Sequence, residues 1–385
     1  MFTSHLLIIQ YCTILVMAAL YAPQPLLPVL ADAFQVGEAR AALLITVTLL
    51  PLALAPIAYG VLLQRVSARR LLMVSIWVLA ASQAAVALVN HFELFLLLRL
   101  VQGLAIPAML TGLMTYLGAS AGPGRIPQVM AMYVASTVMG GFLGRAVSGA
   151  ISAGFGWRWS FLVFGLATVL GALLLQRLKS DPAVSFQRVR FSAALEVLAK
   201  PRFLRLYVVV FCAFGAFASL LNFLPFRLME LGLGLSERGI GLMYSGYLMG
   251  VLVSLTSLHL AARIGGPRNA MLVGVLILLA ALLFFSAGPL WVLFTGMFVL
   301  CAGMFMIHSL APGVLNQASG DHRGVVNGLY IAFYYAGGTA GSFLPGFIYH
   351  GFGWSAYLAS LAALVALAGW LLWGLRTRNA DTSAV

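Results

Sequence analysis

The sequence predicts an all-α membrane protein with twelve transmembrane helices in two parallel six-helix repeats. Three observations support this prediction: an extreme apolar composition, a series of long apolar runs, and an internal repeat. Of the 385 residues, 62% are hydrophobic and only 8% are charged, whereas a soluble domain is about a quarter charged. The mean hydropathy of +1.03 also excludes a water-soluble globular domain.

The apolar runs define the individual helices. A run of about 20 apolar residues crosses a bilayer as a helix, and lipid offers no partner to a more open backbone. The runs also lack the polar–apolar alternation of barrel strands. We therefore predict twelve spans, over residues 4–30, 41–63, 70–90, 93–118, 128–153, 157–177, 203–230, 238–262, 269–288, 290–316, 324–349 and 354–375.

The internal repeat sets the domain organisation. With a shift of 197 residues, residues 133–157 match residues 330–354 at eleven of 25 positions, and each copy ends in GFGW. Six helices, an even number, separate the two copies, so both halves have the same orientation. We expect an N-terminal bundle over 1–178, a cytoplasmic linker over 179–201 and a C-terminal bundle over 202–385. Each GFGW is expected to form a turn followed by a tryptophan at the membrane interface.

The distribution of basic residues predicts the topology. The net charge is +13, and sixteen of the 22 Lys and Arg residues fall on one side of the predicted topology, against four on the other. The positive-inside rule places the richer side in the cytoplasm, so both termini are expected there. The basic charge is therefore a topology signal and does not indicate nucleic-acid binding. We expect a multi-pass protein of a bacterial-type cytoplasmic (inner) membrane.

Several motifs carry a family resemblance. GVLLQRVSARR, at Gly60–Arg70, is similar to a loop motif G-x-L-a-D-R-x-G-R-R, with Gln64 in place of the aspartate. RLVQGLAIPA, from Arg99, is similar to a helix-4 motif with a buried arginine. The segment GGFLGR, ending at Arg145, resembles the antiporter motif G-P-x-x-G-G with its proline and last glycine replaced. The chain thus resembles the major facilitator superfamily, most closely its acriflavine-sensitivity type of drug:proton antiporter.

The resemblance implies a transporter that works by alternating access, with the loop motif as part of its inner gate. The residues that match or replace this motif are Gly60, Gln64, Arg65, Arg69 and Arg70. In the family, the loop aspartate helps to lock the gate through neighbouring basic residues. Gln64 accepts hydrogen bonds but has no charge, so we expect a weaker lock here.

Charged groups inside the membrane are functional candidates, because they are costly to keep there. Arg99, Arg145 and His308 lie well inside predicted helices, whereas all nine acidic residues lie at helix ends or in loops. His308 is the expected proton carrier, with Asp32 and Glu230 as alternatives. Each arginine has a structural alternative, in which backbone carbonyls or a nearby acid satisfy it. His308 has a similar alternative as a hydrogen-bonded core residue.

The two arginines are expected to contact substrate, since the position equivalent to Arg145 in the second half is a serine, Ser342. A charge that is present in only one half indicates a function specific to that half, such as holding an anionic group. Further polar and aromatic residues fall on the helices that line the cavity in the resembled family. Those expected to contact substrate are Tyr21, Gln24, Gln102, Asn222, Tyr330 and Tyr334, and Tyr133, Tyr244, Tyr247 and Tyr335 lie on the same helices.

These features predict a secondary active transporter, and they favour a proton-coupled exporter of a small organic or drug-like solute. The alternatives are a proton-coupled importer or uncoupled facilitator of a small anionic metabolite, and a non-transporting membrane sensor or scaffold. We expect no enzyme activity, since nucleotide-loop, zinc-spacing and HExxH motifs are absent. No cofactor and no metal are expected. The expected partners are a small-molecule substrate, protons and the lipid bilayer, with the protein as a monomer.

Overall fold

The computed structural model describes residues 2–62, 66–120, 126–178, 191–319 and 322–375, and every regular element within them is helical. The first half contains α1 (Phe2–Tyr21), η1 (Gln24–Leu26), α2 (Leu27–Ala33), α3 (Glu38–Leu62), α4 (Ala68–Val86), α5 (Phe92–Ser120), α6 (Ile126–Phe155) and α7 (Trp157–Leu175). After α8 (Phe191–Leu198), the second half contains α9 (Pro201–Glu230), α10 (Glu237–Met243), η3 (Tyr244–Gly246), α11 (Tyr247–Arg263), α12 (Pro267–Phe284), α13 (Leu290–Gln317) and α14 (Arg323–Trp373).

The twelve predicted membrane spans are confirmed. Ten helical segments are long and apolar enough to cross a membrane. One of them, α14, holds two spans that meet at Gly353, where φ is 77°, and α3 supplies the remaining span. The first span is broken into α1, η1 and α2, because Pro23 and Pro25 lack the backbone N–H that would continue the helix.

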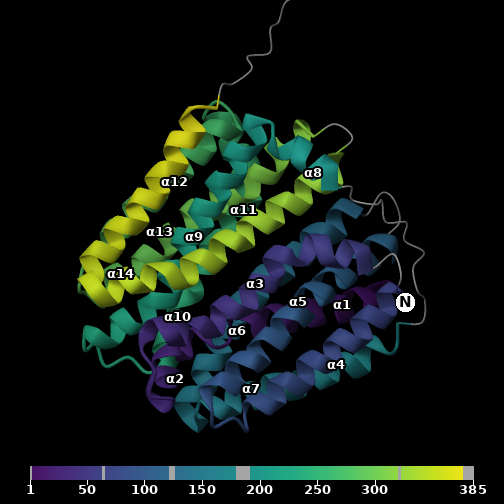
Figure 1. The fold of residues 1–385 in the computed structure, drawn as a ribbon, viewed down its shortest axis with the longest axis vertical. Coiled ribbons are helices and arrows are strands. Elements are labelled where there is room, and N and C mark those ends of the chain that lie inside the picture. Colours follow the sequence, from purple (N-terminus) through teal and green to yellow (C-terminus); the bar gives the residue numbers. More distant parts are fainter. Residues whose placement is uncertain (1, 63–65, 121–125, 179–190, 320–321, 376–385) are drawn as a thin grey trace, which may run out of the picture.

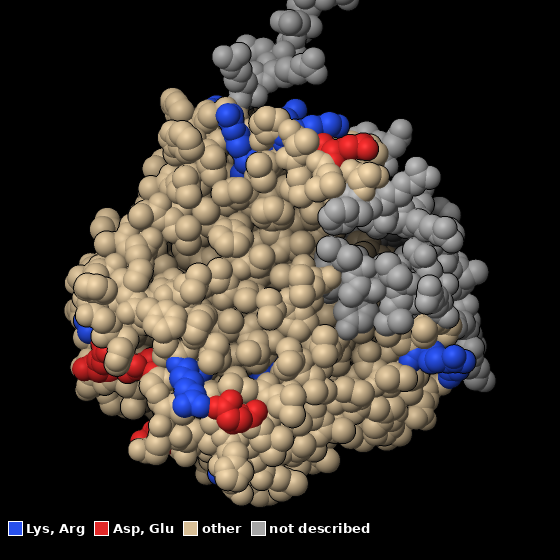
Figure 2. Space-filling model, in the orientation of Figure 1, with Lys and Arg blue, Asp and Glu red and all other residues tan. Residues whose placement is uncertain are grey.

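Figure 1 shows the two halves as adjacent bundles, α1–α7 in purple and blue and α9–α14 in green and yellow. They pack most closely where α3 meets α14 and where α6 meets α10. The short helix α8 and the N-terminus lie at one end of the molecule, and α2 and α10 lie at the other (Figure 1). Figure 2 shows that the charged side chains on this face gather near the helix ends and leave an uncharged band between them.

Glycines of the repeat allow equivalent helix pairs to approach closely in both halves. A Cβ atom added at Gly144 of α6 would lie 2.5 Å from Ala18 Cα of α1. One added at Gly341 of α14 would lie 2.7 Å from Gly215 Cα of α9. Both distances are far below carbon–carbon contact, so small residues are required there, as in other membrane helix pairs. The first helix of each half is therefore held at a fixed place beside the fifth.

The expectation of interfacial tryptophans in the GFGW segments is wrong in one respect. The turn is present in both copies, with φ of 91° at Gly156 and 77° at Gly353. However, Trp157 and Trp354 are only 6% and 7% exposed. Trp157 stacks on Phe95, and Trp354 Nε1 donates to the carbonyl of Phe285 at 2.7 Å. The tryptophans face the protein because each turn directs the next helix back against its own bundle.

Candidate functional site

A chain of hydrogen bonds runs through the middle of the molecule and joins the two halves. Arg145 Nε of α6 donates to Gln24 Oε1 of η1 at 2.6 Å, and Gln24 Nε2 donates to Asn222 Oδ1 of α9 at 2.5 Å. Asn222 Nδ2 then donates to the carbonyl of Ser342 in α14 at 3.2 Å. The Ser342 hydroxyl lies 2.7 Å from that of Thr46 in α3. We call these five residues the central network, and it crosses between the halves twice.

The central network follows the internal repeat. Arg145 and Ser342 are equivalent under the shift of 197 residues, and Asn222 lies within one residue of the position equivalent to Gln24. Each half therefore contributes a side-chain amide from its first helix and a residue from its fifth. The halves differ at one point, because the first has a guanidinium where the second has a hydroxyl. The positive charge is thus an addition to a scaffold that both halves share.

Arg145 is the charged centre of the network. It is fully buried, and no acidic side chain pairs with it among the described residues. Its Nη1 donates to the carbonyl of Gly141 at 2.6 Å, whereas its Nη2 has no hydrogen-bond partner within the described part of the chain. Burying a charge costs on the order of several kcal/mol unless partners compensate it. A donor nitrogen without a partner at this position therefore needs an explanation.

Three tyrosine rings surround the Arg145 guanidinium. Its central carbon lies 4.0 Å from the ring centre of Tyr21, 4.7 Å from that of Tyr247 and 5.0 Å from that of Tyr244. Each ring face attracts a cation, by about 0.5–2 kcal/mol. Tyr21 comes from the first half and the other two come from the second. Aromatic faces from both halves therefore surround the cation.

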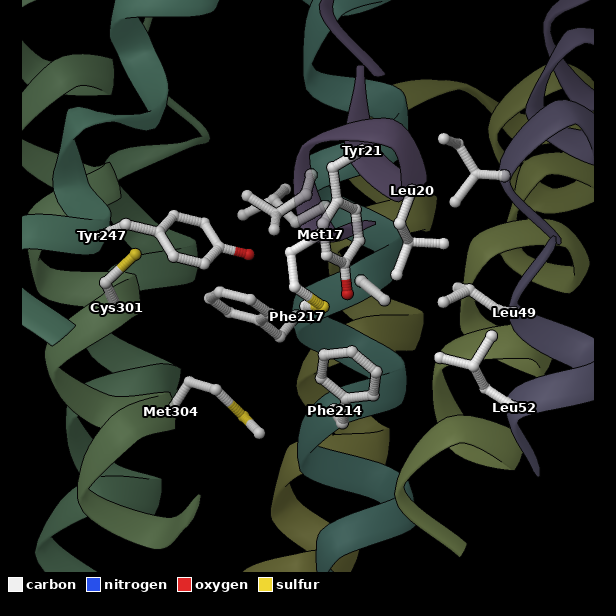
Figure 3. Packing of buried hydrophobic residues seen from close by; sticks show 14 of the residues in the cluster. Met17, Leu20, Tyr21, Leu49, Leu52, Phe214, Phe217, Tyr247, Cys301 and Met304 are labelled. Atoms are coloured by element: carbon white, nitrogen blue, oxygen red, sulfur yellow. The ribbon is translucent and has the colours of Figure 1, made fainter. Parts of the chain in front are cut away.

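An aromatic path leads from Arg145 into the second half. Figure 3 shows Tyr21, Phe214, Phe217 and Tyr247 grouped around the same space, with Met17 and Met304 beside them. The Tyr247 and Phe217 ring centres are 5.9 Å apart, and those of Phe217 and Phe214 are 6.1 Å apart. Phe214 stacks on Tyr334 at 3.7 Å. Rings from α1, α9, α11 and α14 thus form one continuous surface.

His308 lies at the far end of this path. Its ring centre is 4.7 Å from that of Tyr334, and its Nδ1 lies 2.7 Å from the hydroxyl of Tyr330. The same hydroxyl donates to the His308 carbonyl at 3.3 Å. His308 is only partly buried although it lies deep in α13, which leaves part of its ring accessible inside the bundle.

Comparison of the two halves shows which contacts of His308 are common to both and which belong to the second half alone. Tyr133, the equivalent of Tyr330, donates its hydroxyl to the carbonyl of Leu110 at 2.8 Å. Both halves therefore bond the fifth helix to a carbonyl of the fourth. Leu110 lies within one residue of the position equivalent to His308 and offers the same carbonyl to the tyrosine, so the imidazole is an addition in the second half, as the guanidinium of Arg145 is in the first.

The geometry of Arg99 and Gln102 favours the structural alternative. Arg99 is fully buried, and its guanidinium donates to the carbonyls of Leu44 at 2.8 Å, Ala19 at 3.0 Å and Leu20 at 2.7 Å. It also donates to Gln102 Oε1 at 2.6 Å. The carbonyl of Ala19 would normally bond the N–H four residues on, but that residue is Pro23. Arg99 therefore supports the helix break that positions Tyr21 and Gln24.

Neither the alternative proton sites nor the described gate residues belong to the central network. Asp32 is exposed on α2, and Glu230, at the end of α9, pairs with Arg227 at 3.1 Å. Among the gate residues, Gly60 lies in α3, and Gln64 and Arg65 lie outside the described residues. Arg69 donates to the carbonyl of Gln176 at 3.4 Å, and Arg70 is exposed.

Sequence reasoning missed Thr46 and Ser148. Ser148 donates to the carbonyl of Ala22 at the break after α1, at 2.6 Å. Thr46 bonds its own helix at Ala42 as well as Ser342. A hydroxyl in an apolar helix ordinarily bonds a carbonyl one turn back, so neither residue stands out. A signal was present in the position of Ser148, which lies one turn of helix from Arg145.

Comparisons with known proteins agree with the fold. The family model described as Major Facilitator Superfamily matches residues 11–264 and 228–384. The uncharacterized MFS-type transporter YybF of Bacillus subtilis is 23% identical over 360 residues, covering 92% of this chain and 89% of the relative. The inner membrane transport protein YnfM of Escherichia coli is 26% identical over 365 residues, covering 93% and 87%.

Two solved structures share the fold at low identity. A bacterial homologue of the human lysosomal transporter Spinster, in an inward-facing and occupied conformation, has a TM-score of 0.78 at 16% identity, with 96% of this chain and 95% of the other covered. A mutant of the nucleoside transporter NupG has a TM-score of 0.78 at 15% identity, with 96% and 98% covered. Together with the family match along nearly the whole sequence, they lead to one conclusion: this chain is a multi-pass secondary transporter of the major facilitator superfamily.

Proposed function

We propose that this transporter exports a small organic solute with an anionic or hydrogen-bond-accepting group in exchange for protons. The observation that carries the proposal is Arg145, a fully buried cation between the two halves, one nitrogen of which has no partner in the described part of the chain. A cation in a low-dielectric site attracts an anion and repels a proton. The aromatic surface beside it suits an aromatic or amphiphilic, drug-like body.

In this proposal His308 carries the proton. It lies at the other end of the aromatic path, and its neighbours are Tyr330, Tyr334 and Phe305. Histidine is the side chain whose charge changes near physiological pH. The fixed cation and the titratable ring lie at opposite ends of the aromatic path, so substrate and proton can influence one another along it. Asp32 and Glu230 remain the alternative proton sites, at the end of the molecule that carries α2 and α10.

Alternating access follows from where the halves meet. Beyond the central network, the contact of His350 with Glu38 at 3.6 Å and the packing of α10 against α6 join the halves at the α2 and α10 end. We propose that this end faces outward and that the basic end faces the cytoplasm. The name of the E. coli relative, an inner membrane transport protein, supports the same membrane for this chain. We also propose that the protein acts as a monomer.

The test uses proteoliposomes that contain a trapped pH-sensitive dye. A panel of small acids, bases and neutral amphiphiles is added, and proton movement is recorded with and without an imposed pH gradient. Two variants copy the other repeat: Arg145→Ser, which resembles Ser342, and His308→Leu, which resembles Leu110. Arg145→Ser is expected to reduce transport at least about tenfold, since a charge-assisted hydrogen bond of about 1.5 kcal/mol or more is lost.

His308→Leu is expected to remove dependence on the pH gradient while exchange of labelled for unlabelled solute continues. Retained gradient dependence in this variant would assign the proton to Asp32 or Glu230. Solute flux that never moves protons in the wild type would favour the second candidate, an uncoupled facilitator or an importer of a small anionic metabolite. The buried cation favours that second candidate over a sensor or scaffold without transport.

A further inference from the structure

The Arg145 guanidinium has one edge that matches a carboxylate. Its Nε and Nη2 hydrogens point in parallel from the same edge, the arrangement that binds both oxygens of a carboxylate. Gln24 Oε1 occupies the Nε position at 2.6 Å, and Nη2 has no partner among the described residues. The opposite nitrogen, Nη1, is held by the carbonyl of Gly141. Gln24 therefore fills half of a two-oxygen site whose other half is unused.

The walls around this edge fit an aromatic acid. Tyr21 and Tyr247 face the guanidinium, and Figure 3 shows their hydroxyl ends directed toward the space bordered by Phe214 and Phe217. The hydroxyl of Tyr244 donates to the carbonyl of Leu221 at 2.7 Å, whereas those of Tyr21 and Tyr247 bond none of the described residues. Two hydroxyl donors and one guanidinium edge are thus available beside apolar rings.

Occupation of this edge would change the contact between the halves. The amide of Gln24 holds Arg145 through its oxygen and Asn222, in the other half, through its nitrogen. A carboxylate with two oxygens on Nε and Nη2 must take the place of the Gln24 oxygen. Once released from Arg145, the Gln24 amide is free to rotate away from Asn222.

We propose that the substrate is a small aromatic carboxylate that binds the Nε–Nη2 edge of Arg145 by displacing Gln24, and that this exchange loosens the link between Gln24 and Asn222. Substrate recognition and the release of the contact between the halves are then one event. The inference rests on the proposed function and names its substrate class. It also explains why the charge is present in only one half, since a single cation selects a single carboxylate.

The binding test compares an acid with its uncharged isostere. Purified protein in detergent at neutral pH is titrated calorimetrically with 2-naphthoate and with 2-naphthamide. We expect saturable binding of the acid and at least about 30-fold weaker binding of the amide. Arg145→Ser should lose the preference for the acid. Equal binding of acid and amide by the wild type, or an unchanged acid preference in Arg145→Ser, would overturn the proposal.

Variants of Gln24 and Asn222 test substrate recognition by Arg145 and the link between the two halves separately. Gln24→Leu removes the competitor for Arg145, so 2-naphthoate should bind about tenfold more tightly. Asn222→Leu cuts only the link that the acid would otherwise have to loosen, so the acid should bind this variant more tightly than the wild type, by a smaller factor than Gln24→Leu. Weaker binding of the acid by a folded Gln24→Leu protein would show that Gln24 contacts the substrate and is not displaced by it.

The linkage is measured as a distance between the halves. Spin labels are placed on Ala33→Cys in α2 and Ser236→Cys before α10, both exposed, while the native Cys12, Cys212 and Cys301 are buried. Pulsed electron resonance should show that 2-naphthoate shifts the population toward longer distances in the wild type and not in Arg145→Ser. Asn222→Leu should show the longer distance without ligand. A distribution that 2-naphthoate leaves unchanged in the wild type would refute the linkage.

These measurements need no proton gradient. Loss of acid selectivity would refute the substrate class and leave gradient-driven transport of another solute intact. Conversely, acid-selective binding without proton-coupled flux would refute the proposed coupling and leave the Arg145 site standing.

Discussion

At the scale of residues, two buried arginines in one half have different surroundings. Arg99 donates to three backbone carbonyls and to the Gln102 side chain, which accounts for all three nitrogens. Arg145 donates to one side-chain amide and one carbonyl, and its Nη2 has no partner among the described residues. We therefore expect a guanidinium with every nitrogen bonded to the protein to support the fold, and one with an unused donor to bind a ligand.

Removal of Arg99 is therefore expected to affect stability first. Arg99→Met fills similar volume but leaves the carbonyls of Ala19 and Leu20 without this partner, at an expected cost of about 3 kcal/mol in the free energy of unfolding. Denaturant unfolding in detergent measures the change. Arg145→Ser is the matched variant and should stay within about 1 kcal/mol of the wild type. The reverse order of stabilities would assign the supporting role to Arg145.

A tyrosine pair distinguishes the two halves. Tyr133→Phe and Tyr330→Phe each remove a hydroxyl that bonds a helix carbonyl, so both should reduce stability by about 1 kcal/mol. Only Tyr330 also contacts His308 Nδ1. Tyr330→Phe should therefore move the pH profile of transport by about 0.7 unit, the equivalent of one such hydrogen bond, and Tyr133→Phe should leave it in place. Equal profiles for the two variants would separate His308 from the transported proton.

The sequence predicted most members of this site but not their arrangement. Arg145 was expected to contact substrate because charged groups are costly inside a membrane, and Gln24 and Asn222 because their helices line the cavity in the resembled family. That the two amides bond each other depends on the Pro23 break, which turns Gln24 toward α9. The role of Arg99 also depends on which carbonyls that break leaves unpaired. Thr46 becomes a link only because α14 packs against α3, which no local pattern of α3 encodes.

At the scale of elements, the repeated glycines determine how the first and fifth helices of each half approach. The shift of 197 residues pairs Gly144 with Gly341 in the sequence, and both meet the backbone of a first helix, at Ala18 and Gly215. Both glycines belong to a small-xxx-small spacing, Gly140-xxx-Gly144 and Gly337-xxx-Gly341, the sequence pattern that allows such close packing. The same pattern gave no indication that α10, which starts the eighth span, would pack against α6 of the other half.

Substitutions in these glycines test the packing. Gly144→Val and Gly341→Val should each reduce the free energy of unfolding by at least about 2 kcal/mol, because a branched side chain has no room there. Gly154→Ala is the control, since an added Cβ meets nothing within 4 Å, and it should be near neutral. Expression level and denaturant unfolding give the readout. A Gly144→Val protein as stable as Gly154→Ala would mean that α1 and α6 lie farther apart.

At the scale of the whole molecule, the proposed topology assigns each end of the bundle to one side of the membrane. Ser192 in α8 and Ser236 before α10 are both exposed and lie at opposite ends of the molecule. A membrane-impermeant thiol reagent added to intact cells should label Ser236→Cys and not Ser192→Cys, until the membrane is permeabilised. Labelling of Ser192→Cys in intact cells would reverse the topology.

The unpaired charge of Arg145 also exposes the carrier to the membrane voltage. Whichever end is closed carries most of the electric field, so the centre takes the potential of the open side. Moving one elementary charge through 100 mV changes the energy by about 2.3 kcal/mol. A potential negative inside therefore favours the inward-open empty carrier, and a bound monoanion cancels this bias. For an exporter, return of the substrate-free carrier to the inward-open state should quicken as the potential grows, whereas exchange between loaded states should be less sensitive to voltage. Potassium diffusion potentials across proteoliposomes would distinguish these two steps.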